Sequence, residues 1–136
     1  MPRRPPGAVR AVMSRTPGPS RPFSEVRGLP RRARSAVRRL EARRFGPGFL
    51  AASLRGYEGA LRRPGRWLYV ESADCPCHDP MGDRDGVEAF LRSMPRLARR
   101  DLRSVVARLD EEFERRTLPD PFAPPGAWWQ RRLGSP

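Results

Sequence analysis

Regularly spaced apolar residues are confined to the middle of this chain, and this limits what the chain can fold into. Residues 1–24 and 117–136 are rich in proline and carry few apolar residues at helical or strand spacing. About 90 residues remain to build a core, which is enough for one small domain. The sequence therefore predicts a disordered arm at 1–24, a helical core domain at 25–118 and a proline-rich tail at 119–136.

Three segments of the middle region carry apolar residues at helical spacing and predict helices at about 30–44, 49–62 and 95–116. Their stripes are Leu29, Ala33, Val37 and Leu40; Leu50, Leu54, Tyr57 and Leu61; and Leu97, Ala98, Leu102, Val105, Leu109 and Phe113. Ser93 is the expected cap of the third helix, and Glu111–Arg115 and Glu112–Arg116 are its expected ion pairs. Gly56 and Gly59 either weaken the second helix or permit close packing against a neighbour.

Between the second and third of these helices the pattern changes. Residues 66–71 combine aromatic and β-branched side chains and are the best strand candidate. A strand needs a partner from the chain ends, from another subunit or from a hairpin, and without one this stretch would be an extended buried segment. Residues 72–84 are expected to form a loop, after which Asp85 caps a short helix over 86–92 with Glu88 completing a capping box. The predicted fold class is a mainly α small domain of about four helices, with at most one or two short strands and disordered basic or proline-rich termini.

Charge is the second constraint, because all 28 basic residues are arginine and the formal net charge is +13. A GC-rich genome would produce this composition through codon usage alone, so the absence of lysine weakens the functional argument. The placement of the charge is more informative. Residues 1–44 hold 13 arginines against Glu25 and Glu41, whereas residues 71–94 carry a net negative charge. Such an asymmetry favours polyanionic partners.

The arginine-rich region therefore predicts a small, basic, non-enzymatic accessory or regulatory protein that associates with nucleic acid. Phosphate contacts of this kind give steep salt dependence and little sequence preference. The alternative interpretation of the basic helix is a solvated face without a partner. The residues expected to contact nucleic acid are Arg3, Arg4, Arg10, Arg15, Arg31, Arg32, Arg34, Arg38 and Arg39.

A cluster of potential metal ligands lies in the loop after the strand candidate. Cys75, Cys77, His78 and Asp79 are all side chains that zinc accepts, which raises the hypothesis of a metal-binding protein. The spacing argues against it, because structural zinc sites usually draw on two separated ligand pairs. A loop with reduced thiols is the simpler interpretation, and the acidic surroundings disfavour a nucleophilic cysteine.

The C-terminal tail and the remaining aromatic residues support another hypothesis, a protein-interaction module. Trp67, Tyr69 and the Trp128–Trp129 pair would then meet a partner. The competing interpretation, slightly favoured, is that the tail folds back and the tryptophan pair fills a groove in the small core. No apolar run is long enough for a membrane span and no secretory signal is evident, so a cytoplasmic protein is expected.

Overall fold

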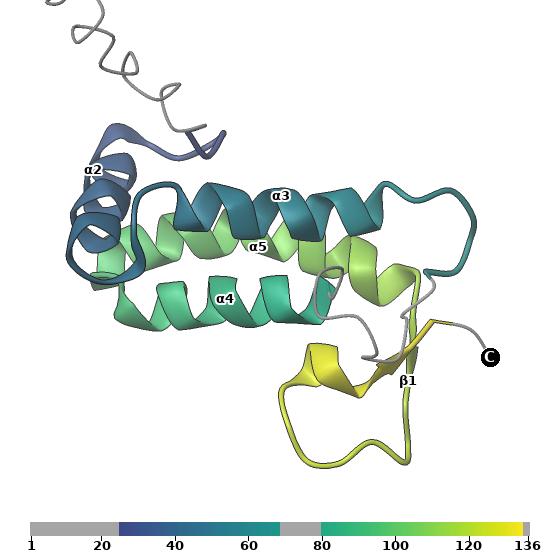
Figure 1. The fold of residues 1–136 in the computed structure, drawn as a ribbon. Helices are drawn as coiled ribbons and strands as arrows, with labels where there is room; N and C mark the ends of the chain where they lie inside the picture. Colours follow the sequence, from purple (N-terminus) through teal and green to yellow (C-terminus); the bar gives the residue numbers. More distant parts are fainter. Residues whose placement is uncertain (1–24, 69–79, 135–136) are drawn as a thin grey trace, which may run out of the picture.

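The structure is a computed structural model that describes residues 25–68 and 80–134. These residues form a mainly α-helical fold, as predicted (Figure 1). Three helices lie side by side: α3 (Phe49–Leu61), α4 (Pro80–Ser93) and α5 (Arg96–Arg115). A shorter helix, α2 (Arg31–Leu40), lies at one end of them, and a two-stranded antiparallel ribbon of β1 (Leu118–Pro119) and β2 (Arg132–Leu133) lies near the other. The arm predicted over 1–24 is outside the described residues.

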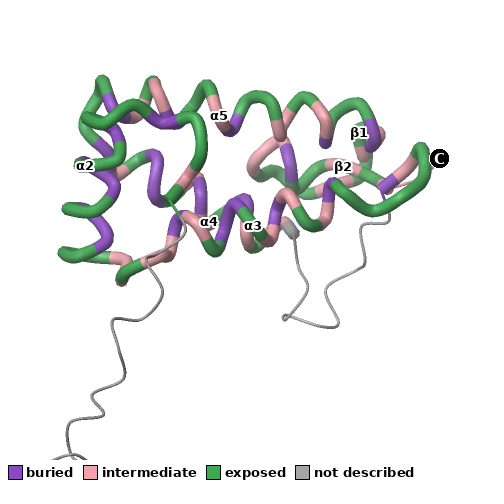
Figure 2. The backbone as a smooth tube through the Cα atoms, turned by 90° about the horizontal axis from the view of Figure 1, so that it is seen from above, coloured by how far each residue is buried: buried purple, intermediate pink, exposed green. Residues whose placement is uncertain are grey.

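The first two predicted helices are confirmed, with one change of geometry. α2 continues into a single π-helical turn, η1 (Glu41–Phe45), which stops at Gly46. Gly46 and Gly48 have positive φ angles of 89° and 78°, which glycine adopts without strain, so the chain can reverse and enter α3 within a few residues. Figure 2 shows that the exposed residues of α2 face away from the bundle and its buried residues face toward it.

α4 begins earlier than the sequence predicts. It starts at Pro80, so part of the expected loop is helical and Asp85 lies inside the helix rather than at its cap. Glu88 accepts hydrogen bonds from Arg84 and Arg92 within the same helix instead of completing a capping box. Proline suits a first helical turn, and packing offsets the weak helix propensity of the glycines. A Cβ atom on Gly86 would lie 3.1 Å from Ser53 Oγ and 3.3 Å from Phe49 Cζ of α3, so this glycine allows close approach.

α5 matches the predicted third helix, but three details are corrected. Ser93 does not cap it, because the Ser93 hydroxyl donates to the Ala89 carbonyl within α4. Leu97 is 62% exposed and does not belong to the buried stripe, which includes Val106 instead. Arg115 pairs with Glu112 rather than Glu111. The expected Glu112–Arg116 pair is present at 3.7 Å.

The predicted strand over 66–71 is wrong for the part that the structure describes. Arg66–Leu68 form bends and coil, and residues 69–71 are outside the described residues. The Leu68 N–H donates to the Arg116 carbonyl, and the Leu68 side chain is buried. Aromatic and β-branched residues mark a half-buried strand only when a neighbouring strand is available, and here the segment packs on helices instead.

The interior consists of two apolar clusters, one toward each end of the bundle. The larger cluster joins α2, α3, α4 and the first half of α5, and it contains the rings of Phe45, Phe49 and Phe90. The second cluster is built from Tyr57, Leu61, Leu68, Phe113 and Trp129. The tail therefore folds back onto the helices, and the interpretation of the tryptophan pair as core is confirmed for Trp129. Trp128 is half-buried beside Phe113.

Candidate polyanion interface

Positive charge is concentrated at the end of the bundle where α2 lies. The segments 25–50 and 92–108 hold 14 arginines against Glu25, Glu41 and Asp101, a net charge of +11. The other described residues hold nine arginines and nine carboxylates, a net charge of zero. The two basic segments meet in space, because Arg32 pairs with Asp101 and Arg44 donates to Ser93. We call the surface formed by these two segments the basic end (Figure 1).

Some arginines of α2 and η1 are paired and others are not. Arg32 binds Asp101 through two hydrogen bonds of 3.0 and 3.2 Å. Arg34 and Arg38 both bind the Glu25 carboxylate. Arg31, Arg39 and Arg43 are exposed and form no ion pair with any carboxylate of the described chain.

The start of α5 adds a second row of exposed arginines. Arg96, Arg100 and Arg103 recur at intervals of four and three residues, so they share one face of the helix. All three are exposed and form no ion pair among the described residues. Arg99 differs, because it donates to the carbonyls of Arg92 and Met94 and so satisfies the end of α4. The row of three is thus available to a ligand, whereas Arg99 is part of the fold.

The charge pattern of α5 is not one that stabilises a helix. Its first turn carries Arg96 and Arg99 and no carboxylate, whereas its last turns carry Asp110, Glu111, Glu112 and Glu114. The helix macrodipole favours the reverse arrangement, with carboxylates at the N-terminus and cations at the C-terminus. Helix stability therefore does not explain why the arginines lie where they do.

At the opposite end of the bundle, arginine is used to hold the fold together. The Arg84 side chain is only 5% exposed, and it donates to both oxygens of Asp110 at 2.9 and 3.0 Å and to Glu88. Its guanidinium lies 4.1 Å from the centre of the Trp129 ring, and the indole N–H of Trp129 donates to Asp85. Burial by itself lowers the pKa of Arg84, but the hydrogen bonds to the carboxylates of Asp110 and Glu88 raise the pKa by more. The net shift is therefore upward.

Two other arginines tie loops to the end of α5. Arg116 is buried and donates to the carbonyls of Leu61, Arg63 and Gly65, which close the end of α3. Arg132 donates to the Thr117 hydroxyl and to the carbonyls of Glu114 and Thr117. Neither guanidinium is free for a ligand. Tyr57 completes this region by donating to Asp110, and burial raises the pKa of its hydroxyl.

The structure brings together the described members of the predicted nucleic-acid set. Arg31, Arg32, Arg34, Arg38 and Arg39 all lie on α2, while Arg3, Arg4, Arg10 and Arg15 are outside the described residues. The prediction did not include Arg43, Arg96, Arg100 and Arg103. A signal for the last three was present, because arginines four and three residues apart open the longest helix, with Asp101 as the one carboxylate among them.

The predicted metal ligands and the predicted aromatic docking residues differ in what the structure describes of them. Cys75, Cys77, His78 and Asp79 are outside the described residues, and within 25–68 and 80–134 no three metal-binding side chains gather at one point. Trp67 is half-buried under Arg66. The most exposed aromatic residue of the described chain is instead Phe122, at 93% exposure.

Comparisons with known proteins give no relative for this chain. No family, no curated protein and no solved structure matches it. Within the described residues, no helix is both long and apolar enough to cross a bilayer.

Proposed function

We propose that this protein is a non-enzymatic nucleic-acid-associated accessory protein that binds the phosphate backbone through its basic end. The observation that carries the proposal is that six exposed arginines on α2, η1 and the first half of α5 form no ion pair within the described chain. These residues are Arg31, Arg39, Arg43, Arg96, Arg100 and Arg103.

Guanidinium groups suit phosphate because their planar donors match two oxygens at once. A membrane surface is a weaker candidate, since interfacial helices need an exposed apolar face beside the charges. The apolar residues of α2 are buried, and Leu97 is the large apolar side chain exposed on the described part of the basic end. An extended polyanion therefore fits this surface better than a lipid bilayer.

The first 24 residues strengthen the same proposal through their composition. They contain five arginines and no carboxylate, and they join the described chain at Glu25, which belongs to the basic end. A ligand held by α2 and α5 would meet this additional charge. Arg3, Arg4, Arg10 and Arg15 thus remain part of the proposed interface.

A salt-titrated binding experiment on random-sequence DNA and RNA duplexes tests the proposal. We expect micromolar or tighter binding at low salt, with affinity falling steeply between about 50 and 200 mM salt. Replacing Arg31, Arg39 and Arg43 together by Gln should reduce the magnitude of the log–log salt slope by about 2 to 3, because each lost phosphate contact removes about 0.9. Absence of binding at low salt would remove the proposal.

The matched control replaces three exposed arginines at the opposite end, Arg62, Arg63 and Arg66, by Gln. This variant loses the same charge from the whole molecule but none from the basic end. Its salt slope should stay close to that of the unmodified chain. Equal losses in the two variants would show that net charge, rather than this surface, determines binding.

A second candidate function, docking to a protein partner, is favoured by Phe122. This ring is 93% exposed in a proline-rich loop, where the Phe122 N–H donates to Asp120 Oδ1 and stiffens the turn. An exposed aromatic side chain on a hydrogen-bonded turn is typical of an anchor residue at an interface. A pull-down comparing the unmodified chain with Phe122→Ser tests this. Equal recovery of the same partners would show that Phe122 is not an anchor for them.

A further inference from the structure

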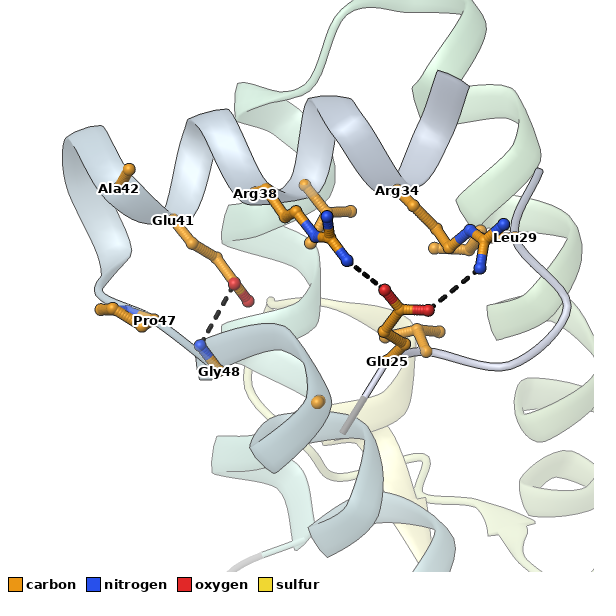
Figure 3. A pocket seen from close by; sticks show the side chains of 11 residues that line it. Glu25, Leu29, Arg34, Arg38, Glu41, Ala42, Pro47 and Gly48 are labelled. Atoms are coloured by element: carbon orange, nitrogen blue, oxygen red, sulfur yellow. Dashed lines mark hydrogen bonds and ion pairs between the residues drawn. The ribbon is translucent and has the colours of Figure 1, made fainter. Parts of the chain in front are cut away.

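A pocket of about 400 Å³ opens beside α2, on the flank of the basic end. It lies between the segment that precedes α2, the α2–η1 helix and the start of α3 (Figure 3). Aliphatic side chains form most of its wall, namely Val26, Leu29, Val37, Ala42, Pro47 and Ala51. Its volume falls in the range of about 300–1,000 Å³ that small-molecule sites occupy.

The rim of the pocket already holds one carboxylate. Arg34 and Arg38 lie one turn apart on α2, and both guanidiniums reach the carboxylate of Glu25 (Figure 3). The hydrogen bond from Arg34 and that from Arg38 lower the pKa of Glu25, so the bound group is the anion. The three side chains are 43 to 72% exposed, which leaves the bound carboxylate open to exchange with one from solution.

The inner wall determines which end of a ligand can enter. Glu41 is buried in the π-helical turn, and its two oxygens accept the N–H groups of Gly48 and Leu50 at 3.1 Å. These bonds satisfy Glu41, and a second anion placed beside it would be repelled. The anionic group of a ligand must therefore stay at the arginine rim, and its apolar part must fill the interior. Single π-helical turns are frequent at functional sites.

We propose that this pocket binds an amphipathic monocarboxylate. The ligand carboxylate takes the place of Glu25 between Arg34 and Arg38, and its alkyl chain lies against Leu29, Val37 and Pro47. Glu25 acts as an internal competitor that occupies the arginine pair when no ligand is present. The site is separate from the six unpaired arginines of the proposed nucleic-acid interface, so either function can fail without the other.

Titration calorimetry of the full chain with octanoate tests the proposal. Octanoate should bind saturably with one ligand per chain, whereas octanol, which lacks the anion, and acetate, which lacks the tail, should bind at least about tenfold more weakly. Octanol binding as tightly as octanoate, or no saturable octanoate binding, would overturn the proposal.

Variants of the rim should change octanoate affinity in opposite directions, and a charge-matched variant elsewhere separates a specific effect from a general effect of net charge. Glu25→Gln removes the competing anion and should tighten octanoate binding several-fold. Arg34→Gln with Arg38→Gln should weaken it by about tenfold or more, because the ligand carboxylate loses both charge-assisted hydrogen bonds. Glu25→Gln also adds positive charge, so Asp101→Asn, which adds the same charge elsewhere on the basic end, is its control and should leave octanoate binding unchanged.

A third comparison separates this site from the nucleic-acid interface. Replacing Arg31, Arg39 and Arg43 by Gln leaves the pocket intact and should not change octanoate affinity. If this triple variant weakens octanoate binding as much as the Arg34 and Arg38 double variant does, the ligand is held by general surface charge and the proposal is wrong. Thermal unfolding of each variant verifies that the fold persists, and Ala51→Leu, which fills the pocket without altering charge, should abolish binding.

Discussion

At the α2 end of this molecule, Arg31, Arg39 and Arg43 are exposed and form no ion pair within the described chain. At the other end, Arg84 and Arg116 are buried, and each makes three or more polar contacts. Arginine thus serves the fold as a buried, multiply bonded side chain in one region, whereas in the other a group of exposed arginines has no carboxylate partner in the described chain. A genome that favours arginine explains why both regions contain it, but not why the excess over carboxylates lies in one of them.

The partners that each arginine has in the fold say more about its role than the amino-acid composition of the chain does. The net charge of +13 suggests a uniformly basic protein. Yet the described residues outside the basic end, 51–68, 80–91 and 109–134, hold as many carboxylates as arginines, and we call this part the balanced end. The excess lies where α2 and the start of α5 meet, and there the arrangement on α5 opposes the helix dipole. Predictions that remove single arginines from each end can therefore separate the two uses.

The largest expected effect comes from Arg84. Replacing it by Met keeps the approximate volume but leaves the carboxylates of Asp110 and Glu88 without their main partner. Loss of one member of a buried ion pair costs about 3–5 kcal/mol, and we expect about 4 kcal/mol here by urea unfolding. Arg100→Met, on the exposed face of α5, should change stability by less than about 0.5 kcal/mol. Similar losses in both variants would contradict the distinction between the two ends.

Trp129 gives the next largest effect. Its side chain is 7% exposed, packs in the second core cluster and covers Arg84. Trp129→Ala should lower the free energy of unfolding by about 3 kcal/mol. Phe122→Ala is the matched aromatic control in the same tail and should cost less than about 0.5 kcal/mol, because that ring is exposed. If Phe122→Ala were as costly, the tail would not pack as described.

The helices follow from the sequence far better than the arginine cluster around Arg84 does. Helical spacing predicted α2, α3 and α5 well, because apolar stripes report directly which face is buried. The start of α4 was missed, since two glycines and an acidic run look like a loop until the close contact of Gly86 with α3 is known. The Arg84–Asp110–Tyr57 cluster joins three helices, and no local pattern reveals such a contact.

The sequence does not predict the pocket beside α2 either, although it contains one indication of the carboxylate at its rim. Glu25 is the only carboxylate before Glu41, in a stretch otherwise rich in arginine. A lone acid among many bases is a candidate for a specific pairing role. Helical spacing places its partners Arg34 and Arg38 on the exposed face and so predicts that they contact nucleic acid. Only the path of residues 25–29 shows that both bind Glu25.

A smaller effect on stability is expected when several free arginines are removed together. The combined change of Arg31, Arg39 and Arg43 to Gln removes no ion pair within residues 25–68 and 80–134 and should leave the unfolding free energy within about 1 kcal/mol of the unmodified chain. Relief of charge repulsion can even raise it slightly at low salt. A loss as large as that of Arg84→Met, measured by urea unfolding under the same conditions, would show that these arginines are structural.

The smallest effect on stability belongs to Asp101→Asn. The hydrogen bond from Arg32 lowers the pKa of Asp101 in the folded protein, so this pair contributes stability above the pKa of the unfolded state. The contribution is lost as the pH falls through the lowered folded-state value. The variant should therefore be slightly less stable than the unmodified chain at neutral pH and equal to it in strong acid. Because Arg32 is released, nucleic-acid affinity should rise, and a fall in affinity would contradict the assignment of the basic end.

Nitrogen-15 NMR of the arginine Nε–Hε groups, recorded with and without a random-sequence duplex, tests the central claim most directly. Arg84 and Arg132, whose Nε groups donate within the protein, should give resolved signals that do not move when the duplex is added. Signals of Arg31, Arg39, Arg43, Arg96, Arg100 and Arg103 should sharpen and shift together. Shifts spread evenly over both ends, or confined to the balanced end, would contradict the account.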